Sequence, residues 1–200
     1  MLAVAEGAGR MTQAMRSLEA AFLIGVDGVT VIWLVRHGDC YEAMVEGSDP
    51  PLSPLGRTQA ARLAQRAKHA GASAVYASPL RRAVETAHAI TNDIHQDSRL
   101  LEIDLELGVD GNLEFKESAA SVIERMRAAI DDIVSAHPGE HVVVVTHGVA
   151  LMAYISDLLH LEPGQIRLLP YYTSITVVRV LGDRRMAGSL ADVAHLEGDP

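Results

Sequence analysis

The chain has 200 residues, 48% of them hydrophobic and 4% aromatic, which is enough for one globular domain with a sizeable core and does not require a second domain. Its 26 acidic and 17 basic residues give a formal net charge of -9, which disfavours nucleic acid and anionic membrane surfaces as partners. An anionic substrate would therefore need a locally basic pocket.

Cysteine content and hydropathy indicate the cellular compartment in which the protein is expected. Cys40 is the only cysteine, so an intrachain disulfide is excluded and a reducing, cytoplasmic location is expected. No apolar stretch of the sequence reaches the length of a membrane span, and the first residues lack the basic start and long apolar core of a signal peptide. Cys40 is interpreted as a small side chain that fills space, with a reactive thiol as the alternative.

Residues 1–28 are interpreted as an N-terminal extension that is partly disordered, or that packs on the domain or on a neighbouring subunit of a homodimer. The domain itself is expected to span residues 29–200. Within the extension an amphipathic helix is predicted over residues 10–24. Glycines are expected to interrupt both of its ends, at Gly7, Gly9, Gly25 and Gly28.

Residues 29–35 form an apolar run rich in β-branched side chains, typical of a strand that is buried on both faces of a parallel sheet. The run ends at Arg36-His37-Gly38. Because ligands of open α/β sheets bind outside the carboxyl ends of the strands, these residues are predicted to belong to a binding site. Gly38 would let the backbone turn and come close to a ligand.

A loop over residues 39–51 and a helix over residues 54–70 are predicted to follow. Ser53 is a suitable N-cap, Pro54 suits the first helical position, and Gly71 suits the end of the helix. The buried side of this helix is expected to contain Leu55, Ala60, Leu63 and Ala67.

A short strand over residues 73–77 precedes a second helix, predicted over residues 80–92 with Ser78 as its N-cap. Arg81 and Arg82 fall in its first turn, where the positive end of the helix dipole disfavours cations unless an anion binds there. Arg81 is expected to point to solvent, and Arg82 is the candidate anion ligand.

Acidic residues alternate with apolar ones over residues 99–107, as in an extended segment with one acidic face. Glu102, Asp104 or Glu106 could therefore face the site. An amphipathic helix is predicted further on, over residues 117–136.

A second apolar strand, residues 141–146, ends in His147-Gly148 in the same way as the first ends in His37-Gly38. In a parallel sheet the carboxyl ends of the strands lie at one edge, where ligands bind. The two imidazoles are therefore predicted to lie at the same edge of the sheet.

Strand and helix patterns alternate along residues 29–160, which predicts an α/β fold. The expected architecture is a three-layer α/β/α sandwich, with a mostly parallel central sheet and helices on both faces. The last helix of the series is expected over residues 148–160. Two further strands, residues 174–181 and 186–193, are expected to extend the sheet at one edge.

The arginines and histidines predicted at this edge of the sheet suit phosphoryl chemistry. Guanidinium forks match phosphate oxygens, and adjacent positive charge favours a neutral imidazole, the form that a nucleophile needs. The hypothesis is that His37 attacks phosphorus and becomes a phosphohistidine, while Glu102 protonates the leaving alkoxide and then activates water. Charge on the phosphoryl oxygens would be neutralised by Arg36, Arg82 and His147. Two histidines flanked by arginines suit a metal poorly, so no metal is expected.

Several segments of the sequence, in their order along the chain, resemble motifs of the histidine phosphatase superfamily, in its phosphoglycerate mutase-like branch. Residues 49–60 resemble the loop and helix start that follow the nucleophile, and residues 78–87 resemble the second-arginine motif. In that motif the arginine before alanine is the phosphate ligand, so the resemblance implies Arg82. It also implies the phosphoglycerate mutase-like fold and neither a cofactor nor a metal. The nucleophile, proton-donor and second-histidine motifs are matched by Leu34-Val35-Arg36-His37-Gly38, Leu100-Leu101-Glu102 and Val145-Thr146-His147-Gly148.

The sequence departs from the family at two places. Asp39 and Cys40 stand where the family usually has Glu and then Thr or Ser, so a hydroxyl that could touch phosphate is missing. Residues 108–112 replace the Gly-x-Trp-Glu-Gly-like stretch that often follows the acid, which keeps Asp104 open as an alternative to Glu102.

The expected substrate is a small phosphorylated metabolite. Hydrolysis is favoured over phosphoglycerate mutase-type transfer, because the cofactor-dependent mutases of the family carry a long capping insertion that residues 103–146 lack. A protein phosphohistidine phosphatase and a non-catalytic scaffold that binds phosphorylated ligands stay open as alternatives.

Overall fold

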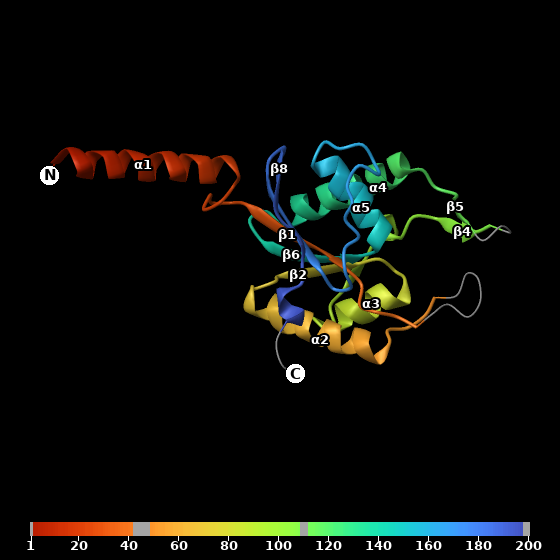
Figure 1. Ribbon diagram of the computed structural model, residues 1–200. Helices are drawn as coiled ribbons and strands as arrows, with labels where there is room; N and C mark the ends of the chain where they lie inside the picture. Colours follow the sequence, from red (N-terminus) through yellow and green to blue (C-terminus); the bar gives the residue numbers. More distant parts are fainter. Residues whose placement is uncertain (1, 42–48, 109–111, 198–200) are drawn as a thin grey trace.

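The computed structural model describes residues 2–41, 49–108 and 112–197 (Figure 1). The first half of the chain forms α1 (Leu2–Ala21), β1 (Thr30–Arg36), α2 (Pro54–His69), β2 (Ala74–Ala77), α3 (Arg81–His88), β3 (His95–Gln96) and the short 3-10 helix η1 (Ser98–Leu100). The second half forms β4 (Leu105–Leu107), β5 (Leu113–Phe115), α4 (Ala119–Ala136), β6 (His141–Thr146), α5 (Gly148–Leu158), β7 (Ile175–Leu181), β8 (Arg184–Asp192) and η2 (Ala194–Leu196).

The central sheet has six strands in the order β3-β2-β6-β1-β7-β8. Strand β1 pairs in parallel with β6, from Val31 opposite His141 to Arg36 opposite Thr146, and β6 pairs in parallel with β2. On its other side β1 pairs with β7 in the antiparallel sense, and β8 continues that edge. The carboxyl ends of β1 and β6 and the amino end of β7 therefore lie at one edge of the sheet.

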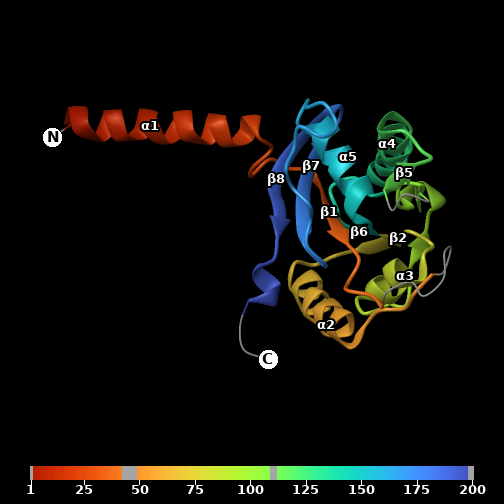
Figure 2. The ribbon, with the colours of Figure 1, turned by 45° about the vertical axis from the view of Figure 1, so that its right-hand side comes forward.

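Helices cover both faces of this sheet, as predicted (Figure 2). Successive side chains of β1 and β6 point to opposite faces, and both faces are buried because each strand is apolar throughout. Helices α4 and α5 pack on the face formed by Ile32, Leu34, Val142 and Val144. Helices α2 and α3 pack on the face formed by Trp33, Val35, Val143 and Val145.

The N-terminal extension forms a single long helix, α1, which projects away from the domain in both views (Figures 1 and 2). The prediction that Gly7 and Gly9 interrupt the helix is wrong, because both lie inside α1. Its carboxyl end is attached to the domain: Arg184 donates to the carbonyl oxygen of Ala21, and Leu23 is buried. Among the described residues, no helix is both long and apolar enough to cross a membrane.

Helix α2 begins as predicted. The side chain of Ser53 accepts from the amide of Gly56, Pro54 is the first helical residue, and Gly71 has a φ of 73° just after the end. Leu55, however, is 55% exposed and not part of the buried side. At about 100° of rotation per residue, Leu55 lies about 100° away from the centre of the buried face. That buried face contains Gly56, Gln59, Ala60, Leu63 and Ala67.

Two other predicted boundaries change. Helix α3 begins at Arg81, and Ser78 is not its N-cap but faces His147 instead. Residues 98–100 form a 3-10 turn, in which the Asp97 carboxylate accepts from the amide of Arg99. The strand predicted over residues 99–107 is thereby limited to β4, which pairs with β5 in a separate two-stranded sheet and not with the central sheet.

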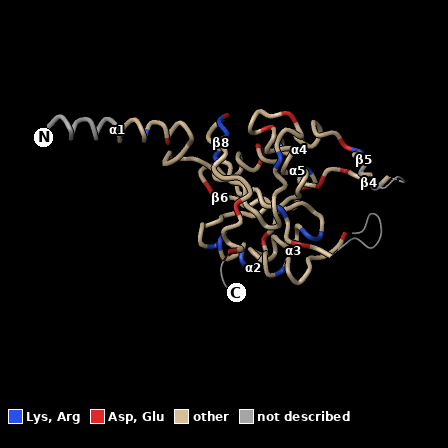
Figure 3. Tube along the Cα trace, in the orientation of Figure 1, with Lys and Arg blue, Asp and Glu red and all other residues tan. Residues whose placement is uncertain are grey.

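Charged residues of both signs are interspersed over the domain (Figure 3). Several of them form ion pairs, such as Arg127 with Asp157 and Arg185 with Asp131. The acidic excess of the chain therefore does not prevent a small basic site.

Candidate active site

The edge where β1 and β6 end opens onto a cavity of about 950 Å³. Arg36 closes β1 and His37 follows it, while α3 brings Arg82 from the neighbouring connection. Glu102 and Tyr172 also line this cavity. His147 lies behind it, fully buried, with its ring centroid 5.1 Å from that of His37. The structure thus brings together all five residues predicted for the site.

His37 is 5% exposed and its two ring nitrogens have different partners. Nδ1 lies 2.7 Å from the carbonyl oxygen of Gly38, and Nε of Arg82 donates to Nε2 over 3.2 Å. A carbonyl can only accept and a guanidinium can only donate, so both contacts require the tautomer with hydrogen on Nδ1. Nε2 therefore keeps its lone pair.

The pKa of His37 is lowered to about 3: burial is the main cause, the bond to the Gly38 carbonyl opposes it, and the guanidinium charges of Arg82 and Arg36 contribute to the lowering. The imidazole is accordingly uncharged near neutral pH, as the sequence predicts. A buried, neutral imidazole with a fixed tautomer has the properties of a nucleophile.

His147 is also uncharged, because burial and then the charges of His37 and Arg82 hold its pKa well below the usual range. Its Nε2 lies 2.7 Å from the hydroxyl oxygen of Ser78. Its Nδ1 is buried and has no hydrogen-bond partner among the described residues. If the Ser78 hydroxyl donates to Nε2, Nδ1 carries the hydrogen and is a donor toward the site.

Arg36 is held by its neighbours on three sides. Its Nη1 donates to the carbonyl oxygen of Pro170 over 2.8 Å, and its guanidinium carbon lies 4.1 Å above the centre of the Tyr172 ring. A Cβ at Gly148 would lie 3.3 Å from Nε, so glycine leaves the space that this guanidinium occupies.

Nε of Arg36 is buried without a hydrogen-bond partner in the described part of the chain, like Nδ1 of His147. Buried donors in native proteins are nearly always paired, so unpaired ones need an explanation. With its hydrogen on Nδ1, His147 together with Arg36 presents two unpaired donors at one edge of the sheet, which match the acceptor oxygens of an anion.

The two arginines of α3 have different roles, as predicted. The Arg82 side chain is 16% exposed, contacts His37 and forms an ion pair of 3.4 Å with Asp49. The Arg81 side chain is 59% exposed and pairs with Glu85 four residues later. Thr86 fixes the helix against the site, since its hydroxyl donates to the carbonyl of Arg82 and accepts from the amide of Gly38.

The loop after His37 is packed against α2. A Cβ at Gly38 would lie 2.8 Å from the carbonyl oxygen of Gly56, so glycine at this position allows a close approach to α2 that the sequence did not predict. The amide of Asp39 donates to the Gln59 side chain, and Ser53 donates to the Asp39 carboxylate. Cys40 lines the cavity, and burial raises the pKa of its thiol, which disfavours the reactive thiolate.

The Glu102 carboxylate lies at the amino end of α5, the helix that begins directly after His147. Oε1 accepts from the amides of Ala150 and Ile103 over 2.8 and 3.0 Å, and Oε2 accepts from Val149 over 3.2 Å. Asp104 also lines the cavity, but its side chain is exposed. Glu102 is therefore the carboxylate whose place is fixed beside the two histidines.

Sequence reasoning missed Tyr172 and the role of Ser78. Tyr172 precedes β7, and because β7 is antiparallel to β1, its start lies at the edge where β1 ends. Its ring centroid is 5.8 Å from that of His37. The signal was available, since a strand that extends the sheet next to β1 in the opposite sense must begin at this edge. Among the described residues, no group of three or more His, Cys, Asp or Glu could hold a metal ion.

A mostly parallel sheet with a pair of neutral histidines and two arginines at its carboxyl edge defines an enzyme of phosphoryl chemistry. The chain belongs to the histidine phosphatase superfamily (branch 1), whose family model matches residues 32–112 and 106–192. Phosphatases and mutases share this family, so the chain is an enzyme of the phosphatase or mutase type.

Curated relatives and solved structures are similar over most of the chain. A probable phosphoglycerate mutase GpmB from Cronobacter sakazakii is 32% identical over 161 residues, which cover 65% of this chain and 75% of that protein. The protein of the same name from Salmonella arizonae is 31% identical over an alignment of 205 positions, which covers 83% of this chain and 94% of that protein. YhfR of Bacillus stearothermophilus has a TM-score of 0.71 and 28% identity, over 84% of this chain and all of that one. Phosphoserine phosphatase of Entamoeba histolytica, in complex with 3-phosphoglyceric acid, has a TM-score of 0.72 and 25% identity over the same shares.

Proposed function

We propose that the protein is a metal-independent phosphomonoester hydrolase, which acts on a small phosphorylated metabolite through a phosphohistidine at His37. The observation that carries the proposal is the fixed tautomer of His37: Nδ1–H donates to the Gly38 carbonyl, and the lone pair of Nε2 lies beside Arg82. A nucleophile for phosphorus needs such a lone pair next to donors that can hold the phosphoryl oxygens.

In the first step the substrate phosphate replaces His37 as the partner of Arg82. Arg36 Nε, Arg82 and His147 Nδ1 donate to its oxygens. Nε2 of His37 then forms a bond to phosphorus as the bond between phosphorus and the ester oxygen breaks. Glu102 gives its proton to the leaving oxygen.

In the second step water releases the phosphate. The Glu102 carboxylate, which the first step has deprotonated, takes a proton from water as the water oxygen attacks phosphorus. The bond between Nε2 and phosphorus breaks, inorganic phosphate leaves, and His37 and Glu102 return to their starting states. The same carboxyl group thus serves as acid and then as base.

The cover of the cavity supports hydrolysis over phosphoryl transfer between substrates. Between Glu102 and His147 the chain forms the β4–β5 hairpin, α4 and β6, with the hairpin extending outward from the domain (Figure 1). The described residues between Glu102 and His147 cover the cavity with little chain, which supports access of water to a phosphohistidine. A mutase must instead keep water away from its phosphoenzyme.

The charges around the cavity also support hydrolysis over phosphoglycerate mutase-type transfer. Its described lining contains three cations, and one of them, Arg125, has all five N–H groups directed at protein acceptors. The sequences of residues 42–48 and 109–111 contain no Lys or Arg. Arg36 and Arg82 would therefore have to bind both the phosphate and the carboxylate of a phosphoglycerate. An ester whose leaving group lacks a carboxylate fits this charge balance better.

The test is phosphate release from p-nitrophenyl phosphate in the presence of EDTA. Wild type is expected to be active, Arg82→Ala and His37→Ala to lose activity, and Arg81→Ala, the matched control on the same helix turn, to keep it. Interconversion of 2- and 3-phosphoglycerate at a higher rate than hydrolysis would show a mutase. Phosphate binding without turnover of any phosphate ester would show a non-catalytic scaffold.

A further inference from the structure

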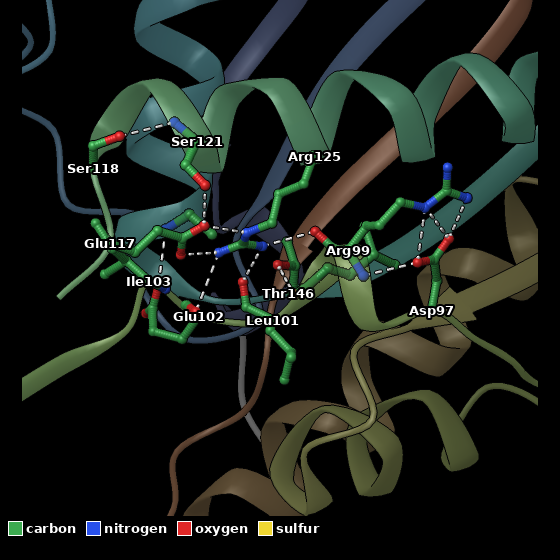
Figure 4. Close-up of polar contacts among 12 residues, drawn as sticks. Asp97, Arg99, Leu101, Glu102, Ile103, Glu117, Ser118, Ser121, Arg125 and Thr146 are labelled. Carbon is green, nitrogen blue, oxygen red and sulfur yellow. Dashed lines mark hydrogen bonds and ion pairs between the residues drawn. The ribbon is translucent and has the colours of Figure 1, made fainter.

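Arg125, on the inner side of α4, binds the segment that carries Glu102 (Figure 4). Its Nη1 donates to the carbonyl oxygens of Arg99 and Leu101, both over 2.7 Å, and its Nη2 donates to that of Glu102 over 3.2 Å. Its remaining N–H groups donate to the two carboxylate oxygens of Glu117 over 2.8 and 2.9 Å.

These contacts use every donor of the side chain. A guanidinium has five N–H groups and no acceptor, and each of the five has a protein partner here. Arg125 lines the cavity, but it has no N–H left for a substrate phosphate. Its function must therefore act through the backbone that it holds, unlike that of Arg36 or Arg82.

The neighbouring carbonyls of the same segment are held as well. The Thr146 hydroxyl, at the end of β6, donates to the carbonyl of Leu100 over 2.7 Å. The amides of Lys116 and Glu117 donate to the carbonyl of Asp104. Since the Glu102 carboxylate is fixed at α5 and its backbone is fixed by Arg125, both ends of this side chain are set.

Glu117 holds Arg125 in turn. Its carboxylate accepts two bonds from Arg125 and one from Ser121, and these bonds lower the pKa of Glu117 to about 2. The side chains of Arg125 and Glu117 are each 18% exposed. A bidentate pair with this little exposure fixes the guanidinium plane, which decides where its other three N–H groups point.

We propose that Arg125, oriented by Glu117, is a positioning residue for the proton transfer by Glu102. This inference rests on the proposed function. Arg125 sets the backbone from Arg99 to Glu102 and thereby the distance from the Glu102 carboxyl group to the leaving oxygen. Its loss should slow reactions that need a protonated leaving group, and it should spare phosphate binding and the attack by His37.

Two substrates separate these steps. The p-nitrophenolate ion leaves without protonation, whereas an alkyl phosphate needs a proton on its leaving oxygen. Both substrates share the later attack of water, so the comparison uses kcat/KM, which reports the steps up to departure of the leaving group. For Arg125→Met we expect kcat/KM with an alkyl phosphate to fall on the order of 10²-fold, the usual contribution of a general acid. With p-nitrophenyl phosphate kcat/KM should fall less than about 5-fold, and inhibition by inorganic phosphate should stay within about 3-fold of wild type.

Three further variants complete the test. Arg127→Met, on the same helix but paired with Asp157 on the exposed side, should behave like wild type. Arg125→Lys, with three donors instead of five, should lose an intermediate factor. Adding Arg125→Met to Glu102→Gln should cause little further loss with the alkyl phosphate, because both changes remove the same proton transfer.

Equal losses of kcat/KM with both substrates, additive losses in the double variant, or no loss at all would overturn the proposal. If Arg125→Met does not fold, Glu117→Gln decides it: a selective loss with the alkyl phosphate supports the positioning role, and an equal or absent loss contradicts it. Wild type that hydrolyses neither substrate would instead contradict the proposed function, so the two failures are distinct.

Discussion

Nε of Arg82 donates a hydrogen bond to Nε2 of His37, the nitrogen that has the lone pair. Attack on phosphorus requires that lone pair to be free, so substrate binding must move Arg82 from the imidazole to the phosphate. The same guanidinium therefore fixes the tautomer of the resting enzyme and then binds the phosphoryl group. This exchange needs a side chain with several donors in one plane.

Arg82→Lys tests this double role. A lysine keeps the charge but loses the planar fork, so we expect kcat/KM for p-nitrophenyl phosphate to fall about 10- to 10³-fold, the effect of losing one or two charge-assisted bonds to phosphate. Arg81→Lys, one residue earlier and largely exposed, should change it less than about 2-fold. Similar losses in the two variants would mean that the helix contributes only general positive charge.

Stability should fall on acidification below about pH 6.5. The pKa of His37 is lowered to about 3, and that of His147 is lowered as well, so between these values and 6.5 the unfolded chain binds protons that the folded chain does not. For His37 alone the loss at pH 4.5 relative to pH 7 is about 2–3 kcal/mol. Urea denaturation at the two pH values measures it.

The control for this pH dependence is His37→Asn. Because asparagine does not titrate, the difference in free energy of unfolding between pH 7 and pH 4.5 should shrink by about 2–3 kcal/mol. An unchanged difference would show that His37 is not buried in its neutral form.

Gly56→Ala should destabilise the loop that follows His37. A Cβ at this position would lie 1.9 Å from the carbonyl oxygen of Asp39, which cannot move without displacing the backbone of the site. We expect a loss of about 1–3 kcal/mol in the free energy of unfolding, with reduced hydrolysis, as for other overpacked contacts. Leu55→Ala, next to it but exposed, should change stability by less than about 0.5 kcal/mol. Equal stability of the two variants would contradict the close contact between α2 and this loop.

Deletion of residues 2–18 should leave the domain and its site intact. Helix α1 projects away from the domain (Figure 2). Its side chains Met15 and Leu18 are about half exposed. Leu23, which is buried, and the carbonyl contacts of Arg184 are kept in this variant. We expect Tm within about 2 °C of wild type and unchanged kcat with p-nitrophenyl phosphate. A large fall in either would show that α1 supports the catalytic domain.

Much of the site follows from the sequence because its residues are tied to strand ends. An apolar strand that ends in a polar residue places that residue at a fixed edge of the sheet. The proximity of His37 and His147 could therefore be predicted from the sequence alone. Arg82 could be predicted as an anion ligand because a cation is unfavourable at a helix start and because its segment resembles the family motif. The register of β1 with β6 then confirms the common edge.

Other residues could not be placed from the sequence. Arg125 is one of two arginines on an amphipathic helix, and its backbone partners lie 23 to 26 residues earlier, in η1 and in the irregular segment that follows it. Ser78 has the sequence context of an N-cap. Its hydroxyl instead lies against Nε2 of the buried His147, which needs a hydrogen-bond partner. The course of α1 depends on contacts near residues 20–23 and not on its own periodicity.

The most direct test of the central claim is to stop the reaction in alkali during turnover and locate the phosphoryl group by mass spectrometry, because a phosphohistidine survives alkali and not acid. Glu102→Gln, which slows release by water, should accumulate the intermediate. The account predicts one added phosphoryl group per chain, on the peptide that contains His37, and none in His37→Ala. Active enzyme that carries no phosphoryl group, or carries it on another residue, would contradict His37 as the nucleophile.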